Sequence, residues 1–275
     1  LADASLERSQ ASMVQSANDR LAGVCSRFTD VHVFDYARIV SEHGLRAWSD
    51  LKLWYLAKIP FGAQAQLELG RRLARHISAV FSTPCKCLVV DLDNTLWGGV
   101  IGEDGIGGIL LGEDYPGNVY KEFQRRLVSL KDQGFLIAAA SKNNETDAKE
   151  VFDKHPDCLL NTDDFAAFEV NWEDKVTSLR KISKDLNIGI DALAFFDDNP
   201  AERAWVASNL PEVTVIDVPD SPLGFARALD ESGAFDRLSF SEEDQMRSTM
   251  YQENKERNRA AKASVSVDDF LRQLE

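Results

Sequence analysis

Four short apolar runs divide the middle of the chain, between about residue 85 and residue 240. They are CLVV (87–90), FLIAAA (135–140), LAFF (193–196) and VTVIDV (213–218). Continuous apolar runs of this length are typical of strands that are buried on both faces of a parallel sheet. The pattern therefore predicts a sheet whose strands are covered on both sides.

Amphipathic stretches separate these runs. In residues 117–134, four apolar side chains fall on one helical face, and Gly134 ends the pattern. Residues 145–154 and 173–187 also predict helices, and Pro200 lies near the first position of another. Strands that alternate with helices of this length predict an α/β fold with a doubly wound parallel sheet.

The flanking regions have a different pattern. Residues 5–24 and 62–81 predict helices, and VHVFD (31–35) predicts a strand. The end of the chain is highly charged and is expected to be helical. The expected division is an N-terminal appendage or remnant of a preceding domain (1–84), an α/β core (85–240) and a C-terminal helical extension (241–275).

Composition narrows the classes of protein that fit. The 275 residues are 44% hydrophobic with a mean hydropathy of -0.27, which is typical of a globular protein, and no apolar run approaches the roughly 20 residues that span a bilayer. The net charge of -14 disfavours a nucleic-acid partner, because such binding needs clustered Lys and Arg. The spacing of the four cysteines fits neither a disulfide framework nor a zinc site, so a cytoplasmic location is expected. They are Cys25, Cys85, Cys87 and Cys158.

Three of the apolar runs end directly in a polar residue: Asp91, Ser141 and Asp197. In doubly wound sheets, the chemistry takes place beyond the carboxyl ends of the strands. We therefore expect these three side chains to share one site.

The segment DLDNT follows the first run and carries two carboxylates. Asp91 would be a nucleophile that forms an aspartyl phosphate, and Asp93 would be the acid/base that protonates the leaving oxygen. Thr95 would hold the loop and help to bind phosphate. The alternative is an acidic turn after a strand, which is the better interpretation of D-x-D alone.

Two further segments could bind an anion. Ser141, Lys142 and Asn143 stand at the start of a predicted helix, where a hydroxyl and backbone N–H groups bind phosphate. The same segment could be only a helix cap and turn. Lys175 could neutralise a phosphate and the carboxylates, or be an ordinary surface lysine.

Asp197 and Asp198 follow the third strand and suit a hard cation such as Mg²⁺. The alternative is a helix-capping turn, DDNP. Together with Asp91 and Asp93 they would repel one another and raise their own pKa values, and a divalent cation makes such a cluster tolerable. We therefore predict a Mg²⁺ site formed by these four residues, to which Asp93 contributes its backbone carbonyl.

In this order, DLDNT, the serine, the lysine and the DD pair resemble the four motifs of phosphotransferases of the haloacid dehalogenase (HAD) superfamily. A closer resemblance is to the FkbH-like glyceryl transferases of polyketide assembly lines. It rests on WSDLKLWYLAKIPF (48–61), KCLVVDLDNTLWGGVIGEDG (86–105), YPGNVYKEFQ (115–124), SKNNETDAKEVF (141–152), NWEDK (171–175), FFDDNPAER (195–203) and the LSFSEED and R-x-x-x-Y pattern (238–251).

This resemblance implies a HAD-like Rossmannoid core with a minimal cap. It also implies a Mg²⁺-dependent enzyme that takes 1,3-bisphosphoglycerate, removes phosphate and loads a glyceryl or lactyl unit onto an acyl carrier protein, beside other polyketide synthase domains. Many members have a Cys immediately before the serine as the acyl acceptor, and this chain has Ala140 there. The alternatives are a HAD phosphatase of a small metabolite or phosphoprotein, and a degenerate docking domain.

Overall fold

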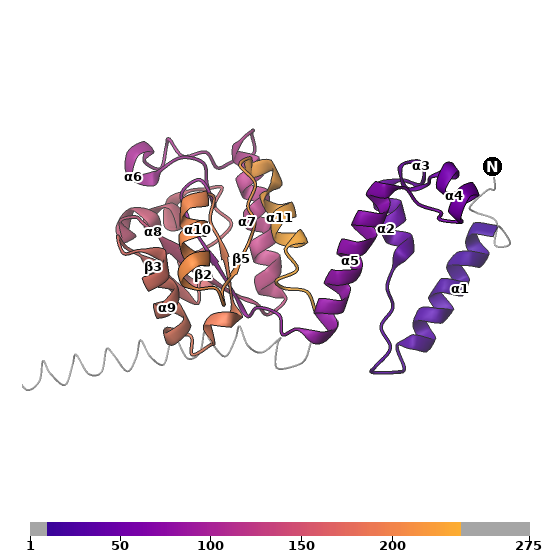
Figure 1. The fold of residues 1–275 in the computed structure, drawn as a ribbon. Coiled ribbons are helices and arrows are strands. Elements are labelled where there is room, and N and C mark those ends of the chain that lie inside the picture. Colours follow the sequence, from indigo (N-terminus) through magenta and orange to yellow (C-terminus); the bar gives the residue numbers. More distant parts are fainter. Residues whose placement is uncertain (1–9, 238–275) are drawn as a thin grey trace, which may run out of the picture. The chain divides into compact units, whose positions relative to one another are not determined.

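The computed structural model of the chain describes residues 10–237 (Figure 1). The predictions for residues 5–9, for the pattern at 238–251 and for the extension at 241–275 lie outside the described residues. The contacts divide the chain into two compact units, one up to Ser78 and one from Ala79 onward. Each unit is described by itself.

The N-terminal unit consists of helices in the residues described. They are α1 (Gln10–Cys25), α2 (Tyr36–His43), α3 (Leu45–Trp48), α4 (Leu51–Ala57) and α5 (Ala63–Phe81), of which the last continues past the boundary. The two predicted helices are confirmed where the structure describes them. The small core contains Ile39, Trp48 and Ala65, and the indole N–H of Trp48 donates to the hydroxyl of Tyr36 at 2.7 Å.

The strand predicted at VHVFD (31–35) is wrong. These residues form an irregular segment, and Val31 and Val33 are 45% and 46% exposed. Asp35 ends the segment by accepting a hydrogen bond from the backbone N–H of Arg38 as the N-cap of α2. The alternation of apolar residues had suggested a strand, but no strand of the described residues pairs with it.

The second unit is built on five parallel strands in the order β3-β2-β1-β4-β5. They are β1 (Cys87–Val90), β2 (Leu136–Ser141), β3 (Ala167–Val170), β4 (Leu193–Phe196) and β5 (Thr214–Val215). Four strands lie where the apolar runs predicted them, and β3 was not predicted. The doubly wound parallel sheet is confirmed.

Helices cover both faces of this sheet. Those of the second unit are α6 (Ile101–Asp104), α7 (Gly117–Asp132), α8 (Glu145–Lys154), α9 (Lys175–Asp185), α10 (Pro200–Asn209) and α11 (Phe225–Glu231). Apolar side chains of α7, α8 and α11 form one core cluster with the sheet, and those of α9 and α10 form the other. None of the helices within 10–237 is both long and apolar enough to cross a membrane.

Alternate residues of each strand point into different clusters. On β1, Leu88 and Val90 belong to the cluster with α7, whereas Cys87 and Val89 belong to the cluster with α9. All four side chains are fully buried, as expected for a strand that is covered on both faces. Because the strands are parallel, the carboxyl ends of β1, β2 and β4 lie at the same edge of the sheet. The strand order reverses around β1, and such sheets bind ligands at the carboxyl edge beside that reversal.

Candidate active site and metal centre

The register of the three central strands brings the predicted site residues together. Val90 pairs with Ala139 on one side and with Phe196 on the other. The next residue, Asp91, donates its backbone N–H to the carbonyl of Phe196 at 3.0 Å. Asp91, Ser141 and Asp197 therefore reach the same edge of the sheet, and all three line one cavity of about 190 Å³.

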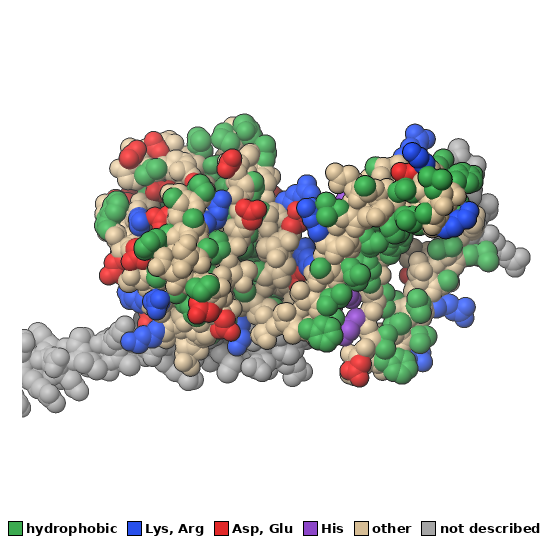
Figure 2. Space-filling view, in the orientation of Figure 1, with side chains coloured by type: hydrophobic (Ala, Val, Ile, Leu, Met, Phe, Trp, Pro, Cys, Tyr) green, Lys and Arg blue, Asp and Glu red, His purple; other side chains and the backbone are tan. Residues whose placement is uncertain are grey.

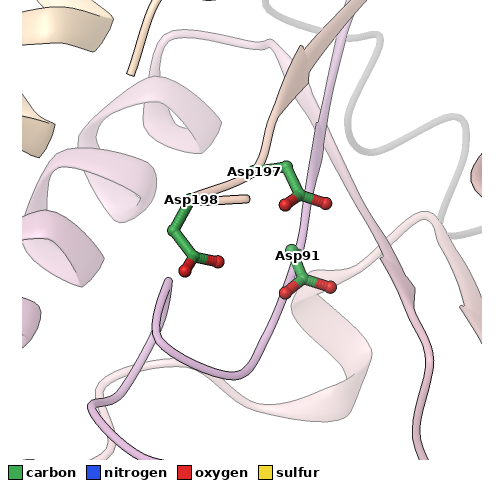
Figure 3. Close-up of side chains that lie close together, drawn as sticks. All are labelled: Asp91, Asp197 and Asp198. Atoms are coloured by element: carbon green, nitrogen blue, oxygen red, sulfur yellow. The ribbon is translucent and has the colours of Figure 1, made fainter. Parts of the chain in front are cut away.

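Three carboxylates surround one space in this cavity (Figure 3). Asp91 comes from the end of β1, and Asp197 and Asp198 come from the end of β4. Each offers an oxygen, and these oxygens all lie within 4.8 Å of one another. A small hard cation takes a few carboxylate oxygens at such spacing and completes its shell with other oxygen ligands.

Asp197 is almost completely buried, with 1% of its side chain exposed. Its Oδ1 accepts a hydrogen bond from the backbone N–H of Asn199 at 2.9 Å. Its Oδ2 lies 3.2 Å from Nζ of Lys175 but has no hydrogen-bond partner of acceptable geometry. A buried carboxylate oxygen without a hydrogen-bond partner is suited to bind a cation, because an unsatisfied buried acceptor lowers the stability of the fold.

Burial and neighbouring charge shift the acidity of this cluster. Burial, followed by the charge of Asp91, raises the pKa of Asp197 from 3.8 to about 7. The same two causes raise the pKa of Asp198, against the lowering effect of a hydrogen bond from Thr95 at 3.3 Å. These shifts show that the carboxylates repel one another and that a cation would relieve the repulsion.

Lys175 is the first residue of α9, and its side chain, which is only 4% exposed, extends into the carboxylate cluster. Its Nζ donates to Oδ1 of Asp91, and it donates to the carbonyl of Ala140 at 2.5 Å. Burial alone would lower the pKa of Lys175, but the charges of Asp91 and Asp197 outweigh it and the pKa rises. The prediction that this lysine lies at a helix start is confirmed, and it neutralises part of the cluster.

Asp93 is held apart from the three-carboxylate cluster. Its Oδ1 accepts from the indole N–H of Trp97 at 2.9 Å and from the backbone N–H of Ile101 at 3.1 Å, and its Oδ2 accepts from the amide of Asn143 at 2.8 Å. Among the residues described, the carboxylate cluster contains only the other three acids, and the role expected for Asp93 at the metal, through its backbone carbonyl, stays a prediction. Asp93 still lines the cavity, as an acid/base must.

The predicted anion-binding segment also lies at the cavity. Ser141 is the last residue of β2, and its hydroxyl accepts from the side-chain amide of Asn143 at 3.2 Å. Lys142 lines the same cavity and pairs with Glu202 of α10. Thr95 is fully buried and supports Asp198 from behind. The structure therefore gathers the predicted residues Ser141 and Lys142 around the carboxylates, with Asn143 beside them.

Ala140, the predicted acyl-acceptor position, has no exposed surface. Its side chain belongs to the apolar cluster with Leu179 and Phe195, on the side of α9 and α10. None of the chain's four cysteines, all of which fall in the described part, lines the cavity. Burial raises the pKa values of Cys85, Cys87 and Cys158, so these thiols are poor nucleophiles.

One positioning residue, Arg203, was missed by the sequence analysis. The guanidinium of Arg203, on α10, donates to the carbonyls of Asp197 at 2.7 Å, Asp198 at 2.9 Å and Val218 at 3.0 Å. It fixes the backbone from which two of the three carboxylates project. Trp97 is fully buried, packs against Phe152 and donates its indole N–H to Asp93, so it combines core packing with positioning of that carboxylate.

The parallel sheet, with its carboxylate cluster at the carboxyl edge, defines a HAD-like α/β domain. Among solved structures, the chain is similar to the N-terminal part of the protein BF1531 from Bacteroides fragilis, which contains a phosphatase domain and was crystallised in complex with Mg. The two are 35% identical with a TM-score of 0.77, and the match covers 84% of this chain and 62% of the other. This chain thus spans about three fifths of the length of that neighbour.

The other comparisons add little. An uncharacterized protein from Corynebacterium glutamicum matches at 10% identity and a TM-score of 0.37, over 55% of this chain and 96% of the other, which is too weak to support any conclusion. No protein-family model matches the chain. A search of curated proteins also finds no match.

Proposed function

We propose that the chain is a Mg²⁺-dependent phosphatase. The observation that carries this proposal is the three-carboxylate cluster, in which one oxygen of Asp91 is fixed by Lys175 at the edge of a HAD-like sheet. The similarity to a phosphatase domain that binds Mg supports it. Mg²⁺, held by Asp91, Asp197 and Asp198, would supply positive charge that attracts the phosphate and offsets charge in the transition state.

The chain's own residues divide the reaction between them. The Asp91 carboxylate bonds to phosphorus while the bond from phosphorus to the leaving oxygen breaks, and Asp93 gives its proton to that oxygen. Asp93 then takes a proton from water, which displaces Asp91 and releases phosphate. Ser141 binds a phosphate oxygen from the β2 side, and Lys142 lines the same cavity. Lys175 orients the nucleophile by its hydrogen bond to Oδ1 of Asp91.

Hydrolysis of p-nitrophenyl phosphate tests this function directly. Wild-type protein should release nitrophenol with Mg²⁺ and lose that activity in EDTA. Asp91→Asn should lower kcat at least about 10³-fold, because a nucleophile cannot be replaced by its neighbours. Asp153→Asn removes an exposed carboxylate on α8 and serves as the control. Equal activity of wild type and Asp91→Asn would refute the assignment.

We further propose a specific substrate on the basis of the resemblance to FkbH-like transferases. The thiol of an acyl carrier protein would bond to the acyl carbon of 1,3-bisphosphoglycerate, and the bond from that carbon to the phosphate oxygen would break. The remaining phosphate ester would then be hydrolysed at Asp91. Because no cysteine lines the cavity, the chain itself should carry no acyl group. Other polyketide synthase domains are the expected neighbours.

Mass spectrometry of both proteins distinguishes the two functions. After incubation with 1,3-bisphosphoglycerate, Mg²⁺ and a phosphopantetheinylated carrier protein, a glyceryl adduct on the carrier would support transfer. Phosphate release with an unmodified carrier would leave the phosphatase of a small metabolite or phosphoprotein. An acyl adduct on this chain would contradict direct transfer to the carrier.

A further inference from the structure

An ion pair joins two sides of the catalytic cavity. Lys142 follows the last residue of β2, and Glu202 lies in the first turn of α10. The Lys142 Nζ is 2.5 Å from Oε1 of Glu202, although the two residues are 60 positions apart in the chain. Both residues line the cavity that contains the three-carboxylate cluster.

Lys142 is the cation that an entering ligand can reach. Among the described residues that line the cavity, the basic ones are Lys142 and Lys175. Lys175 has 4% of its side chain exposed and is already engaged by Asp91, Asp197 and a backbone carbonyl. The Lys142 side chain is 42% exposed and forms its ion pair with Glu202.

The side-chain contact of Glu202 is its ion pair with Lys142, and Glu202 does not cap its own helix. It occupies the third position of α10, where a glutamate often reaches back to the N-cap backbone N–H. That N–H, from Asn199, already donates to Asp197, and the Asn199 side chain caps the helix at Ala201. The Glu202 carboxylate is therefore free to pair with Lys142.

The charges that line the cavity determine how strongly an anionic substrate is attracted or repelled, and the Lys142–Glu202 pair is part of this balance. Five acidic side chains and two basic ones line it: Asp91, Asp93, Asp197, Asp198, Glu202, Lys142 and Lys175. Even with a divalent cation, the lining keeps an excess of negative charge. Glu202 is the acid outside both the metal cluster and the Asp93 network, so it adds repulsion toward an anionic substrate without serving the chemistry.

We propose that Lys142 is an anchor for a second anionic group of the substrate, and that Glu202 masks this anchor until such a group displaces it. This inference rests on the proposed phosphatase function and names its substrate class: phosphate esters that carry a further carboxylate or phosphate. A substrate without that group leaves the ion pair in place. Glu202 is thus a specificity-determining residue, because only a competing anion can uncover Lys142.

Two probes separate anchoring from catalysis. p-Nitrophenyl phosphate lacks a second anionic group, and 3-phosphoglycerate has a carboxylate. The readout is the ratio of kcat/KM for 3-phosphoglycerate to kcat/KM for p-nitrophenyl phosphate, which cancels effects on the shared chemistry. Lys142→Gln should lower this ratio about fivefold and Glu202→Gln should raise it about fivefold, as for loss of a partly exposed charge contact.

The double variant gives the sharpest test. With Lys142→Gln present, removing Glu202 has nothing to uncover, so the ratio in the double variant should stay close to that of Lys142→Gln. Glu150→Gln is the matched control, since it removes a carboxylate from a lysine pair on α8 at 2.6 Å, and its ratio should equal that of wild type. Equal ratios in all variants, or a lower ratio in Glu202→Gln, would overturn the proposal.

Calorimetric titration keeps the proposal testable if the protein hydrolyses neither probe. With Mg²⁺ present, 3-phosphoglycerate should bind wild type more tightly than Lys142→Gln and less tightly than Glu202→Gln. That order without hydrolysis would refute the phosphatase function and support the anchor. Hydrolysis of the two probes with unchanged ratios would support the phosphatase function and refute the anchor. Absence of both binding and hydrolysis would refute the phosphatase function as well as the anchor.

Discussion

The two units of the chain bury their apolar residues to very different extents. In the second unit, two large clusters cover both faces of the sheet, and side chains such as Phe123, Phe165 and Phe195 are fully buried. In the N-terminal unit, the buried cluster consists of Ile39, Trp48 and Ala65. Most of the exposed large hydrophobic side chains of the described residues belong to this unit, and Figure 2 shows them on its visible surface.

The two units also differ in net charge. Lys and Arg outnumber Asp and Glu between residues 10 and 78, whereas the whole chain has a net charge of -14. The acidic unit that contains the carboxylate cluster is therefore joined to a basic helical unit with a small core. The difference teaches that the repelling carboxylates belong to the unit with the large core, where apolar burial can offset the cost of holding them together.

The largest expected effect is on the N-terminal unit. Trp48→Ala removes the centre of its aromatic cluster and the hydrogen bond to Tyr36, at a cost of about 3–5 kcal/mol, so this unit should unfold. Limited proteolysis should then cut before residue 79 while Mg²⁺-dependent phosphatase activity persists. Loss of activity in parallel would show that the units do not fold separately.

A matched pair of leucine substitutions measures the contrast in burial. Leu127→Ala, in the fully buried face of α7, should lower the free energy of unfolding of the second unit by about 2–5 kcal/mol. Leu73→Ala, on α5 with 43% exposure, should lower the stability of its own unit by less than about 1 kcal/mol. Similar costs, measured by urea denaturation, would contradict the difference in burial.

The hydrogen bonds of Arg203 to the end of β4 predict an effect on metal binding. Arg203→Ala frees the carbonyls of Asp197 and Asp198, so the affinity for Mg²⁺ should fall about 10- to 100-fold. Arg180→Ala removes an exposed arginine from α9 and should bind Mg²⁺ as wild type does. Magnesium titration of activity and of melting temperature measures both. Unchanged affinity in Arg203→Ala would mean that the strand end is rigid without this clamp.

The smallest expected effect is a dependence of stability on pH. Because the pKa of Asp197 is about 7 in the folded protein and near 3.8 when unfolded, the folded state binds the extra proton between these values. The contribution of Asp197 to stability is therefore full at low pH and is lost as pH rises toward 7. Mg²⁺ binds the ionised form, so it should raise the melting temperature more at pH 8 than at pH 5.5.

Asp197→Asn is the control for this dependence. The variant cannot titrate at this position, so the melting temperature of the metal-free protein should fall less between pH 5.5 and pH 8 than that of wild type. Differential scanning calorimetry in EDTA measures the slope. An identical slope in both proteins would assign the pH dependence to other groups.

The central strands and their polar ends could be predicted because burial on both faces leaves continuous apolar runs. CLVV and LAFF match β1 and β4 residue for residue. The edge strand β3 was missed because AFEV is short and half-exposed, and it contains Glu169. Residues 31–35 gave the opposite error, since alternation predicts a strand only where a partner strand exists.

The candidate site could be predicted wherever a residue follows a strand directly. Asp91 and Asp197 are of this kind and Ser141 is the last residue of its strand, and the register of the sheet brings the three together. Arg203 could not be found in this way, because its role depends on where α10 returns to the sheet and on the carbonyl of Val218. The separation of Asp93 from the metal cluster depends on Trp97 and Asn143, which only the folded loop brings into contact.

The side-chain amide of Asn143 connects two stages of the proposed reaction. One nitrogen donates both to the Ser141 hydroxyl, where phosphate is expected to bind, and to the carboxylate of Asp93. A phosphate that takes this donor would weaken the hold on Asp93 and let it turn toward the leaving oxygen. Arrival of substrate would thus loosen one of the hydrogen bonds that hold the proton donor in place.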